Sequence, residues 1–393
     1  MQIVSVDIYL LDGGRPGWRP IVCRVNTDEG ICGYGEASVG FDCGAEGAFG
    51  MLREMASMVI GMDPLATQVV WNHMFRDSFW AQGGGVIAFS AISAIDTALW
   101  DIRGKVYQVP VYQLLGGKMH SSLRSYASQL QFGWSDRGMV FDKGYRAEDL
   151  AASARAAVQE GYDAVKINFI TYDAHGGRLG YLTGPLTPDV RHLVDERVAA
   201  VRKAVGDEVD ILAENHGRSD LTSAVELSEI FKAYGVAFME EPNTPMQLDT
   251  CNELALRSQI PIAGGERIFG RRNFLNFFEH HALKVAQPDI GTAGGISEVR
   301  KIADMAQAFD ISVQTHVCGS PIVIAASLQL ECTLANFYIH EHHVTNLSEA
   351  NRRLGKYDYQ PVNGQYQIPD LPGIGQELSE QAIREARMHV LVQ

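Results

Sequence analysis

The chain has 393 residues, of which 46% are hydrophobic, 20% are charged and 39 are glycine, a composition that excludes disordered, collagen-like and coiled-coil proteins. A formal net charge of −14 at pH 7 repels nucleic acid and anionic membrane surfaces, so we expect neither as a partner. An anionic substrate would need local cations, and a chain of this length is expected to form two domains.

Neither export nor membrane insertion is expected from the sequence. Residues 1–11 alternate as a strand does and lack the basic and continuously apolar segments of a signal peptide. The longest apolar run, 321–330, is far shorter than the roughly 20 residues that cross a bilayer. Six cysteines are scattered without a Cys-x-x-Cys pair, which suits reduced thiols. We therefore expect a cytoplasmic protein.

Residues 1–122 read as a mixed domain of strands and helices. Residues 4–11 and 19–25 predict a hairpin, a turn follows at 26–30, and helical patterns begin near residue 48. The clearest helix spans 88–106, where Ile92, Ile95, Leu99 and Ile102 recur at steps of three and four residues. This helix should pack on the domain that follows.

From residue 123 the pattern changes to short apolar runs that alternate with longer helical segments. Such alternation is typical of βαβ units, and eight parallel strands favour a closed barrel. The predicted strands are 125–129, 164–169, 210–216, 236–240, 261–266, 282–289, 311–316 and 335–341. We expect the barrel to span 123–355 and the turn-rich segment 356–393 to return to the first domain.

Three acids stand at the ends of successive predicted strands. Glu214, Glu240 and Glu266 are separated by 26 residues each, as expected when equal βα units deliver the same layer of a barrel. Clustered carboxylates repel unless a cation neutralises them, and hard oxygen ligands favour Mg²⁺. The sequence therefore predicts a divalent metal site, although surface loops of an acidic protein can also end in Glu. Glu241 follows Glu240 and faces away, so we exclude it as a ligand.

An acid and an imidazole end the sixth and seventh predicted strands. Asp289 can hold one ring nitrogen of His316 and leave the other free to take a proton near neutral pH. A buried, merely satisfied His-Asp pair is the alternative. On the second strand Lys166 and Asn168 share a face, where Lys166 can hold a substrate carboxylate, and Glu341 lies on the eighth strand.

Several motifs resemble the mandelate racemase subgroup of the enolase superfamily over nearly the whole chain. They are Ser93-Ala94-Ile95-Asp96-Thr97-Ala98-Leu99-Trp100-Asp101, Leu114-Leu115-Gly116-Gly117, Glu240-Glu241-Pro242, Gly265-Glu266-Arg267, Gln287-Pro288-Asp289 and Ile368-Pro369-Asp370-Leu371-Pro372-Gly373. The resemblance implies an α/β fold, a modified TIM barrel (β/α)₇β with an α+β capping domain built from both termini. The capping domain would comprise residues 1–122 and the returning segment.

The resemblance also implies a chemistry. Mg²⁺ would be bound by Glu214, Glu240 and Glu266, the proton alpha to a carboxylate would be abstracted, and Glu341 would lie by the carboxylate oxygen that gains charge. Two departures stand out: the first metal ligand is usually Asp, and Asn168 replaces the second lysine of the Lys-x-Lys members. The longer Glu214 would bind the ion either directly or through water, and a lysine base is absent.

His216 resembles the strand-three histidine of the galactonate- and mannonate-type acid-sugar dehydratases in this superfamily. Strands three and seven face each other across a ring of eight, so His216 and His316 would flank the substrate. We expect a hydro-lyase in which His316 removes the C2 proton and His216 protonates the departing 3-hydroxyl. The substrate would be an aldonate or aldarate and the product a 2-keto-3-deoxy sugar acid. Racemisation, epimerisation or cycloisomerisation of a sugar acid is the alternative.

Two functions of other classes, Schiff-base catalysis and sugar-acid sensing, stay open. Lys166 or Lys284 could form a Schiff base, although three metal acids argue against it, and a catalytically silent sugar-acid sensor could use the same pocket. In the capping loops, Trp18 and Phe41 could either close over the sugar or simply pack between domains. The long segment 171–188 could form a lid or an oligomer contact. We expect a homo-oligomer, and the sequence does not identify the sugar.

Overall fold

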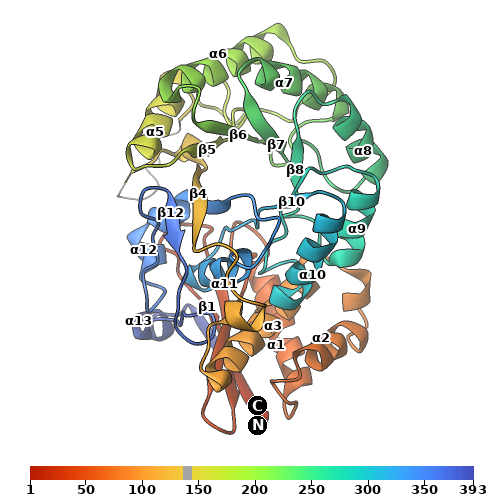
Figure 1. Ribbon diagram of the computed structural model, residues 1–393, viewed down its shortest axis with the longest axis vertical. Coiled ribbons are helices and arrows are strands. Elements are labelled where there is room, and N and C mark those ends of the chain that lie inside the picture. Colours follow the sequence, from red (N-terminus) through yellow and green to blue (C-terminus); the bar gives the residue numbers. More distant parts are fainter. Residues whose placement is uncertain (136–143) are drawn as a thin grey trace.

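The computed structural model describes residues 1–135 and 144–393. Figure 1 shows a ring of strands surrounded by helices, with a second layer of strands and helices beneath it that contains both chain termini. The predicted division into a capping domain and a barrel is visible in this arrangement. The first layer carries the strand ends where the candidate residues lie.

The capping domain is built on an antiparallel sheet in the order β13-β1-β2-β3. β1 pairs with β2 from Leu10 opposite Ile21 to Ile3 opposite Thr27, which confirms the predicted hairpin. The C-terminal β13 completes the sheet on the other side of β1, with Val392 opposite Val6. The elements are β1 (Ile3–Leu10), β2 (Ile21–Thr27), β3 (Cys32–Ala37), α1 (Ala45–Val59), α2 (Thr67–Arg76), η1 (Ala81–Gly83), α3 (Val86–Tyr107), α4 (Val111–Leu114) and β13 (Met388–Val392).

The long helix α3 packs against β3 at a distance that only glycine allows. A Cβ atom at Gly35 would lie 1.9 Å from the carbonyl oxygen of Ala94, and one at Gly33 would lie 2.1 Å from that of Ala98. α3 is buried on almost every side, because the faces of this helix that do not contact β3 contact α1, α2 and the barrel helix α10. The helix predicted at 88–106 is therefore present and joins the two domains.

Eight parallel strands form the barrel in the order β10-β9-β8-β7-β6-β5-β4-β11. Closure between the two ends of this order comes from a single bridge, in which Val313 of β10 lies opposite Phe337, shortly before β11. All eight predicted strands exist, but most end earlier than expected because their polar last residues turn into loops. The strands are β4 (Ser122–Ser128), β5 (Ala164–Ile167), β6 (Asp210–Glu214), β7 (Val236–Glu240), β8 (Ile262–Gly264), β9 (Val285–Ala286), β10 (Ser312–Val313) and β11 (His340–His343).

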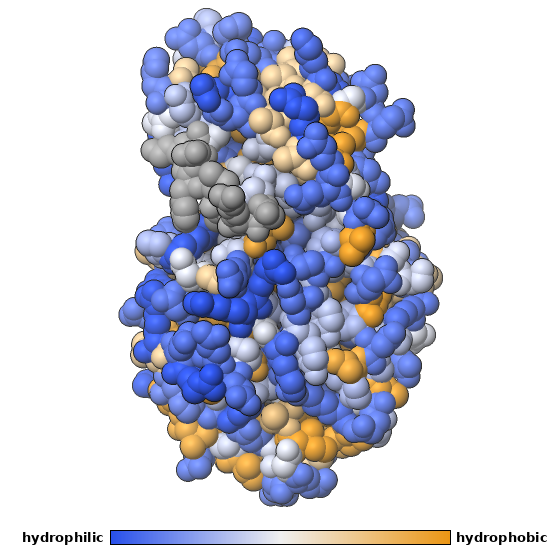
Figure 2. All heavy atoms as spheres, turned by 90° about the vertical axis from the view of Figure 1, so that its left-hand side faces the viewer, coloured by the Kyte–Doolittle hydropathy of each residue, from blue (hydrophilic) through white to orange (hydrophobic). Residues whose placement is uncertain are grey.

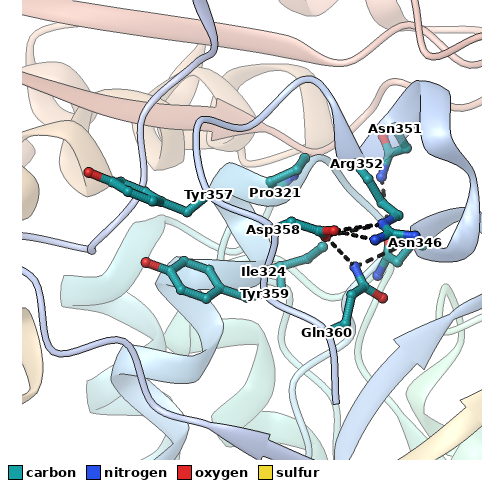
Figure 3. Close-up of a pocket in the computed structure, with 9 residues that line it drawn as sticks. All are labelled: Pro321, Ile324, Asn346, Asn351, Arg352, Tyr357, Asp358, Tyr359 and Gln360. Carbon is teal, nitrogen blue, oxygen red and sulfur yellow. Dashed lines mark hydrogen bonds and ion pairs between the residues drawn. The ribbon is translucent and has the colours of Figure 1, made fainter. Parts of the chain in front are cut away.

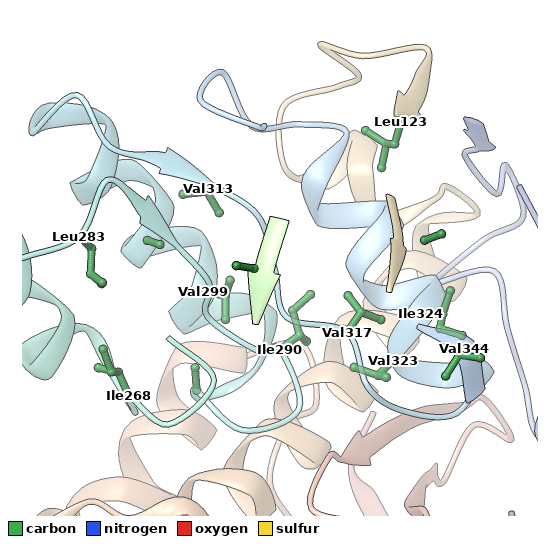
Figure 4. Close-up of a cluster of buried hydrophobic side chains, with 14 of the residues drawn as sticks. Leu123, Ile268, Leu283, Ile290, Val299, Val313, Val317, Val323, Ile324 and Val344 are labelled. Carbon is green, nitrogen blue, oxygen red and sulfur yellow. The ribbon is translucent and has the colours of Figure 1, made fainter. Parts of the chain in front are cut away.

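Helices follow the strands in turn and make the barrel a modified (β/α)₇β type. They are α5 (Ala147–Gln159), α6 (Pro188–Val205), α7 (Leu221–Ala233), α8 (Leu248–Arg257), α9 (Arg271–Glu279), α10 (Gly295–Ala308) and α11 (Pro321–Glu331). Side chains of strands and helices share one apolar core, part of which Figure 4 shows around Val313, Val317 and Val323. Each fully buried aliphatic side chain of this kind stabilises the fold by about 1.5–3 kcal/mol.

The apolar run at 321–330 forms α11, every residue of which is buried. It lies between the barrel and the capping domain, where Glu36 of β3 accepts hydrogen bonds from the backbone N–H groups of Ser320 and Val323. Burial raises the pKa of Glu36 to about 7, although these hydrogen bonds oppose the rise. A carboxylate of one domain thus caps a helix of the other.

The C-terminal segment serves both domains. β12 (Gln365–Gln367) pairs antiparallel with β4 of the barrel before β13 reaches the capping sheet. The prediction that residues 356–393 return to the capping domain therefore holds for the end of this segment, whereas the middle of the segment extends the barrel sheet. The remaining elements are η2 (Leu130–Phe132), η3 (Val344–Leu347), α12 (Glu349–Arg352) and α13 (Glu380–Arg384).

The surface is mainly hydrophilic on the face shown in Figure 2, with small apolar patches scattered over it. Among the helices of residues 1–135 and 144–393, none has both the length and the apolar character needed to cross a membrane. The predicted apolar run 321–330 is instead the buried α11.

Candidate active site

The candidate residues lie together at the C-terminal ends of the barrel strands. Glu214 and Glu240 are the last residues of β6 and β7 and stand opposite each other in the ladder between these strands. Glu266 and His316 follow the ends of β8 and β10, and Asp289 follows β9. Parallel strands bring their carboxyl ends to one rim, so the local sequence order is enough to gather these side chains.

Lys166 lies at the centre of three buried carboxylates. Its Nζ is 2.7 Å from Glu240, 3.1 Å from Glu214 and 3.1 Å from Glu341, and all four side chains are 1% exposed. Burial alone would lower the pKa of Lys166, but the charges of Glu240 and Glu341 hold it well above its usual range. The sequence predicts that Lys166 faces a substrate carboxylate, whereas the structure adds three carboxylates of the protein itself as its partners.

The donor chemistry of this cluster fits a divalent cation. Burial and the neighbouring charge of Glu214 raise the pKa of Glu240 to about 7, which marks an excess of negative charge there. Oε2 of Glu214 accepts no hydrogen bond from the described residues and has Nζ of Lys166 at 3.1 Å as an ion-pair partner, while its Oε1 accepts the backbone N–H groups of Asn215 and His216. Oxygen donors of this kind suit Mg²⁺.

The third predicted ligand, Glu266, is engaged elsewhere. Its carboxylate contacts the guanidinium of Arg267, and its Oε2 lies 3.2 Å from Nε2 of His316. Across residues 1–135 and 144–393, no three His, Cys, Asp or Glu side chains are grouped closely enough to enclose a metal ion. The structure thus brings Glu214 and Glu240 together, and Glu266 pairs with cationic side chains because opposite charges attract in a buried site. Glu241, excluded as a ligand, contacts Arg267 instead.

Asp289 and His316 form the predicted dyad. Oδ2 of Asp289 lies 2.7 Å from Nδ1 of His316, and its Oδ1 accepts the backbone N–H of Gly291 at 2.6 Å. Burial opposes protonation of His316, but the charge of Glu266 and the hydrogen bond that the ring donates to Asp289 raise its pKa to about 10. The prediction of a free nitrogen titrating near neutral pH therefore differs from the structure, in which Nε2 faces Glu266.

His216 reaches the cluster by a turn of the backbone. β6 ends at Glu214, and His216 has a φ of 51°, so the alternation of a strand does not set the direction of this side chain. Nδ2 of Asn168 lies 3.1 Å from Nδ1 of His216, and Oδ1 of Asn168 accepts the N–H of Ile170. Asn168 therefore donates to Nδ1, which leaves the proton of the neutral ring on Nε2. Burial lowers the pKa of His216.

Glu341 is held by residues that the sequence analysis did not identify. Ser128 donates its hydroxyl to Oε1 at 2.6 Å, and the backbone N–H of Val317 donates to Oε2 at 3.0 Å. Burial alone would raise the pKa of Glu341, but the charges of Lys166 and His316 hold it below its usual range. Glu341 is thus an anion with fixed orientation.

Gln287 is a second residue that sequence reasoning missed. Its Nε2 donates to Oε2 of Glu240 at 2.6 Å, so the amide fixes one of the two adjacent carboxylates. It belongs to the motif 287–289, and its position two residues before Asp289 on the sixth strand was the available signal.

The two capping-domain aromatics have different environments. Trp18 is 1% exposed and donates its indole N–H to Asn351, which fits packing between domains, whereas Phe41 is 58% exposed. The two residues form a bridge, and the guanidinium of Arg15 lies over both rings. Asn351 also lines a hollow beside the end of β11, where Arg352 and Asp358 form an ion pair (Figure 3).

The long loop 171–188 packs on the turn that follows β6. Leu182 forms a bridge with Ser219, and the hydroxyl of Tyr181 donates to the carbonyl of Ser219 at 3.2 Å. The loop therefore supports the segment that carries His216. Of the two lysines considered for a Schiff base, Lys284 is exposed, and Lys166 is a triply paired cation, which is a poor nucleophile.

Comparisons with known proteins agree with this architecture. Residues 149–382 match the family described as "Enolase C-terminal domain-like", and residues 18–116 match "Mandelate racemase / muconate lactonizing enzyme, N-terminal domain". A D-galactonate dehydratase of Ralstonia pickettii is 33% identical over 393 residues, covering 98% of this chain and 94% of that protein. A D-galactonate dehydratase of Pectobacterium atrosepticum is 31% identical, with the same coverage.

A solved structure gives the same result. A member of the enolase superfamily from Salmonella Typhimurium superposes with a TM-score of 0.96 at 45% identity, covering all of both chains. The family matches span most of the chain, and they coincide with the capping domain and the barrel. This chain belongs to the mandelate racemase / muconate lactonizing enzyme family of the enolase superfamily.

Proposed function

We propose that this protein is a hydro-lyase that dehydrates a sugar acid, an aldonate or aldarate, to a 2-keto-3-deoxy sugar acid with the help of Mg²⁺. The observation that carries the proposal is the pair of imidazoles beside one carboxylate cluster, with His316 held by Asp289 and His216 held by Asn168. The D-galactonate dehydratases that resemble this chain over 98% of its length support the same class of reaction.

Glu214 and Glu240 would hold the metal ion, and Glu266 would join them only by giving up its present contacts with Arg267 and His316. When bound, Mg²⁺ supplies positive charge that stabilises the enediolate formed from the substrate carboxylate. Lys166 adds a fixed cation beside this carboxylate and is the shared counter-ion of Glu214, Glu240 and Glu341. Three acids therefore surround one buried ammonium, and a bound cation would offset part of the negative charge that remains.

Proton transfer is assigned to the two histidines. His316 takes the C2 proton on Nε2, because Asp289 occupies Nδ1 and fixes the ring. His216 gives a proton from Nε2 to the departing 3-hydroxyl, because Asn168 occupies Nδ1. In this elimination one C–H bond and one C–O bond break, a C=C bond forms, and the resulting enol tautomerises to the 2-keto product.

The pKa directions of the two imidazoles oppose the protonation states that start this reaction. The pKa of His316 is raised to about 10 mainly by Glu266, and that of His216 is lowered by burial. Neutralising Glu266 with a cation removes the strongest influence that keeps His316 protonated. The pair of imidazoles also fits a second candidate function, epimerisation, in which one ring takes a proton from carbon and the other returns a proton to it.

The test is a screen of mono- and diacid sugars with Mg²⁺, followed by NMR of the products. A 2-keto-3-deoxy acid from at least one substrate supports dehydration and identifies the sugar. Accumulation of an epimer or a cyclic isomer without loss of water would contradict it. Binding without any turnover would instead indicate a sensor. We also propose that the protein is a cytoplasmic homo-oligomer. Light scattering of the purified chain tests the oligomeric state.

A further inference from the structure

A hollow away from the barrel mouth lies between the capping domain and the barrel, and the proposed reaction does not use it. Its volume is about 130 Å³, and it is lined by α2 and the glycine turn 83–84 on one side and by the start of α9 on the other. Figure 1 shows α2 and α9 near the same edge of the molecule, in the capping layer and the barrel layer respectively.

The charge of this hollow is opposite to that of the whole protein. Arg76 comes from the last turn of α2, and Arg271 and Arg272 come from the first turn of α9, while Glu298 is the one acid among the lining residues that the structure describes. The chain as a whole has 33 basic and 47 acidic residues. A cleft lined by one sign of charge concentrates ions of the opposite sign.

Glu298 does not neutralise the three arginines, because its carboxylate pairs with Arg271 alone. Its buried carboxylate accepts the backbone N–H of Arg271 at 2.9 Å and lies 3.3 Å from the guanidinium of the same residue. Within the described part of the chain, neither Arg76 nor Arg272 forms an ion pair. Two guanidinium groups therefore face this hollow with no carboxylate partner in residues 1–135 and 144–393.

The floor of the hollow is aromatic and fixed. The ring centroids of Trp71, Phe75 and Phe89 are 5.3, 5.9 and 6.5 Å apart, and Trp71 and Phe89 are each 4% exposed. Nε1 of Trp71 donates to the carbonyl of Gly294 at 2.8 Å, which ties α2 to the loop before α10. Such a tightly packed floor keeps the shape of the cavity fixed when the arginines at the rim of the cavity bind a ligand.

We propose that this hollow is a second binding site, which takes a small organic anion with a phosphate or carboxylate group through Arg76, Arg271 and Arg272. Both groups accept two parallel N–H bonds from a guanidinium, so they share one recognition chemistry. The exposed amide of Asn72 adds hydrogen bonds to hydroxyl or further oxygen atoms of the ligand, and Asn273, whose Nδ2 donates to the carbonyl of Phe269, offers its Oδ1 to a hydroxyl.

The test is calorimetric titration of the full chain, with Mg²⁺ present, by inorganic phosphate and separately by succinate. The variant is Arg76→Gln combined with Arg272→Gln. The matched control is Arg53→Gln combined with Arg155→Gln, which removes the same charge from exposed positions on α1 and α5. We expect at least one anion to bind, its Kd to rise at least fivefold in the variant and to stay within twofold in the control.

Binding of phosphate alone or of succinate alone identifies which anionic group the site accepts. The proposal is overturned if neither anion binds, or if the variant and the control weaken binding equally. Light scattering on the same samples is the second measurement. A change of molar mass in the variant but not in the control would show that the arginines contact a second copy of the chain, and would also overturn the proposal.

Discussion

Nζ of Lys166 lies 2.7 Å from Oε2 of Glu240 in the interior of the barrel, and both side chains are 1% exposed. Removing one partner of a buried ion pair leaves an uncompensated charge, which destabilises a protein by about 3–5 kcal/mol. Here the same ammonium serves three carboxylates, so its removal affects the whole cluster.

We expect Lys166→Met to lower kcat/KM at least a hundredfold, because the substrate carboxylate and the forming enediolate lose their fixed cation. Lys284→Met is the control, since Lys284 is exposed and lies just before β9, the sixth strand of the barrel. Steady-state kinetics measures the effect, and circular dichroism checks that the variant is folded. An unchanged kcat/KM in a folded Lys166→Met protein would contradict the role.

Activity should require a divalent cation, because Glu214 and Glu240 are adjacent buried carboxylates. Exhaustive EDTA treatment is expected to abolish turnover, and added Mg²⁺ should restore it and raise Tm, since the ion binds the native state. Full turnover after chelation would be incompatible with a metal-dependent reaction. A Tm that does not respond to Mg²⁺ would argue against binding at these residues.

Glu341→Gln is expected to lower kcat about tenfold or more and to change KM little. Ser128 and Val317 hold this carboxylate in one orientation, so the amide keeps the shape of the site and loses its charge. An interaction made mainly in the transition state affects kcat and kcat/KM together. A loss confined to KM would show that Glu341 acts in ground-state binding instead.

The two histidines should block different steps. His316→Asn should neither dehydrate the substrate nor exchange its C2 proton in D₂O, because the base is absent. His216→Asn should still exchange C2 hydrogen for deuterium but form little product, because the acid for the 3-hydroxyl is absent. NMR of recovered substrate measures both. Exchange that survives in His316→Asn and vanishes in His216→Asn would reverse the assignment of base and acid.

The capping sheet should weaken in acid through Asp7. Burial alone would raise the pKa of Asp7, but hydrogen bonds from Asn26, His389 and Arg24 lower it. A carboxyl with a lowered folded pKa contributes stability that is present above its unfolded pKa of about 3.9 and is lost as pH falls through the folded value. Asp7→Asn should therefore cost about 1–2 kcal/mol at pH 6.

This cost should shrink as the pH falls below about 4, where the wild-type carboxylate becomes protonated as well. Urea unfolding at pH 6 and at pH 3 measures the difference between the two proteins. Because His389 belongs to β13 and Asp7 to β1, the loss should include the contact that holds the C-terminal strand on the sheet. An equal cost at both pH values would assign the effect to packing.

The residues that gather at the strand ends of the barrel could be predicted from the sequence, although most strands end earlier than predicted. Each βα unit is a local pattern, and the ends of parallel strands meet at one rim whatever the rest of the chain does. The positions of Glu214, Glu240 and Glu266, and the contact of Asp289 with His316, follow from that rule alone. The hairpin and the long helix were predictable because each is a local periodic pattern, whereas the return of the C-terminus was expected from its turn-rich sequence and from the family resemblance.

Contacts between distant segments were decided only by the tertiary structure. Ser128 meets Glu341 across 213 residues, and Arg76 joins Arg271 and Arg272 in a hollow between two domains. No periodicity encodes such pairs, because they depend on how whole layers pack. The turn at His216 and the ion pair between Glu266 and His316 are further examples, in which backbone strain and local charge override the simple alternation of a strand.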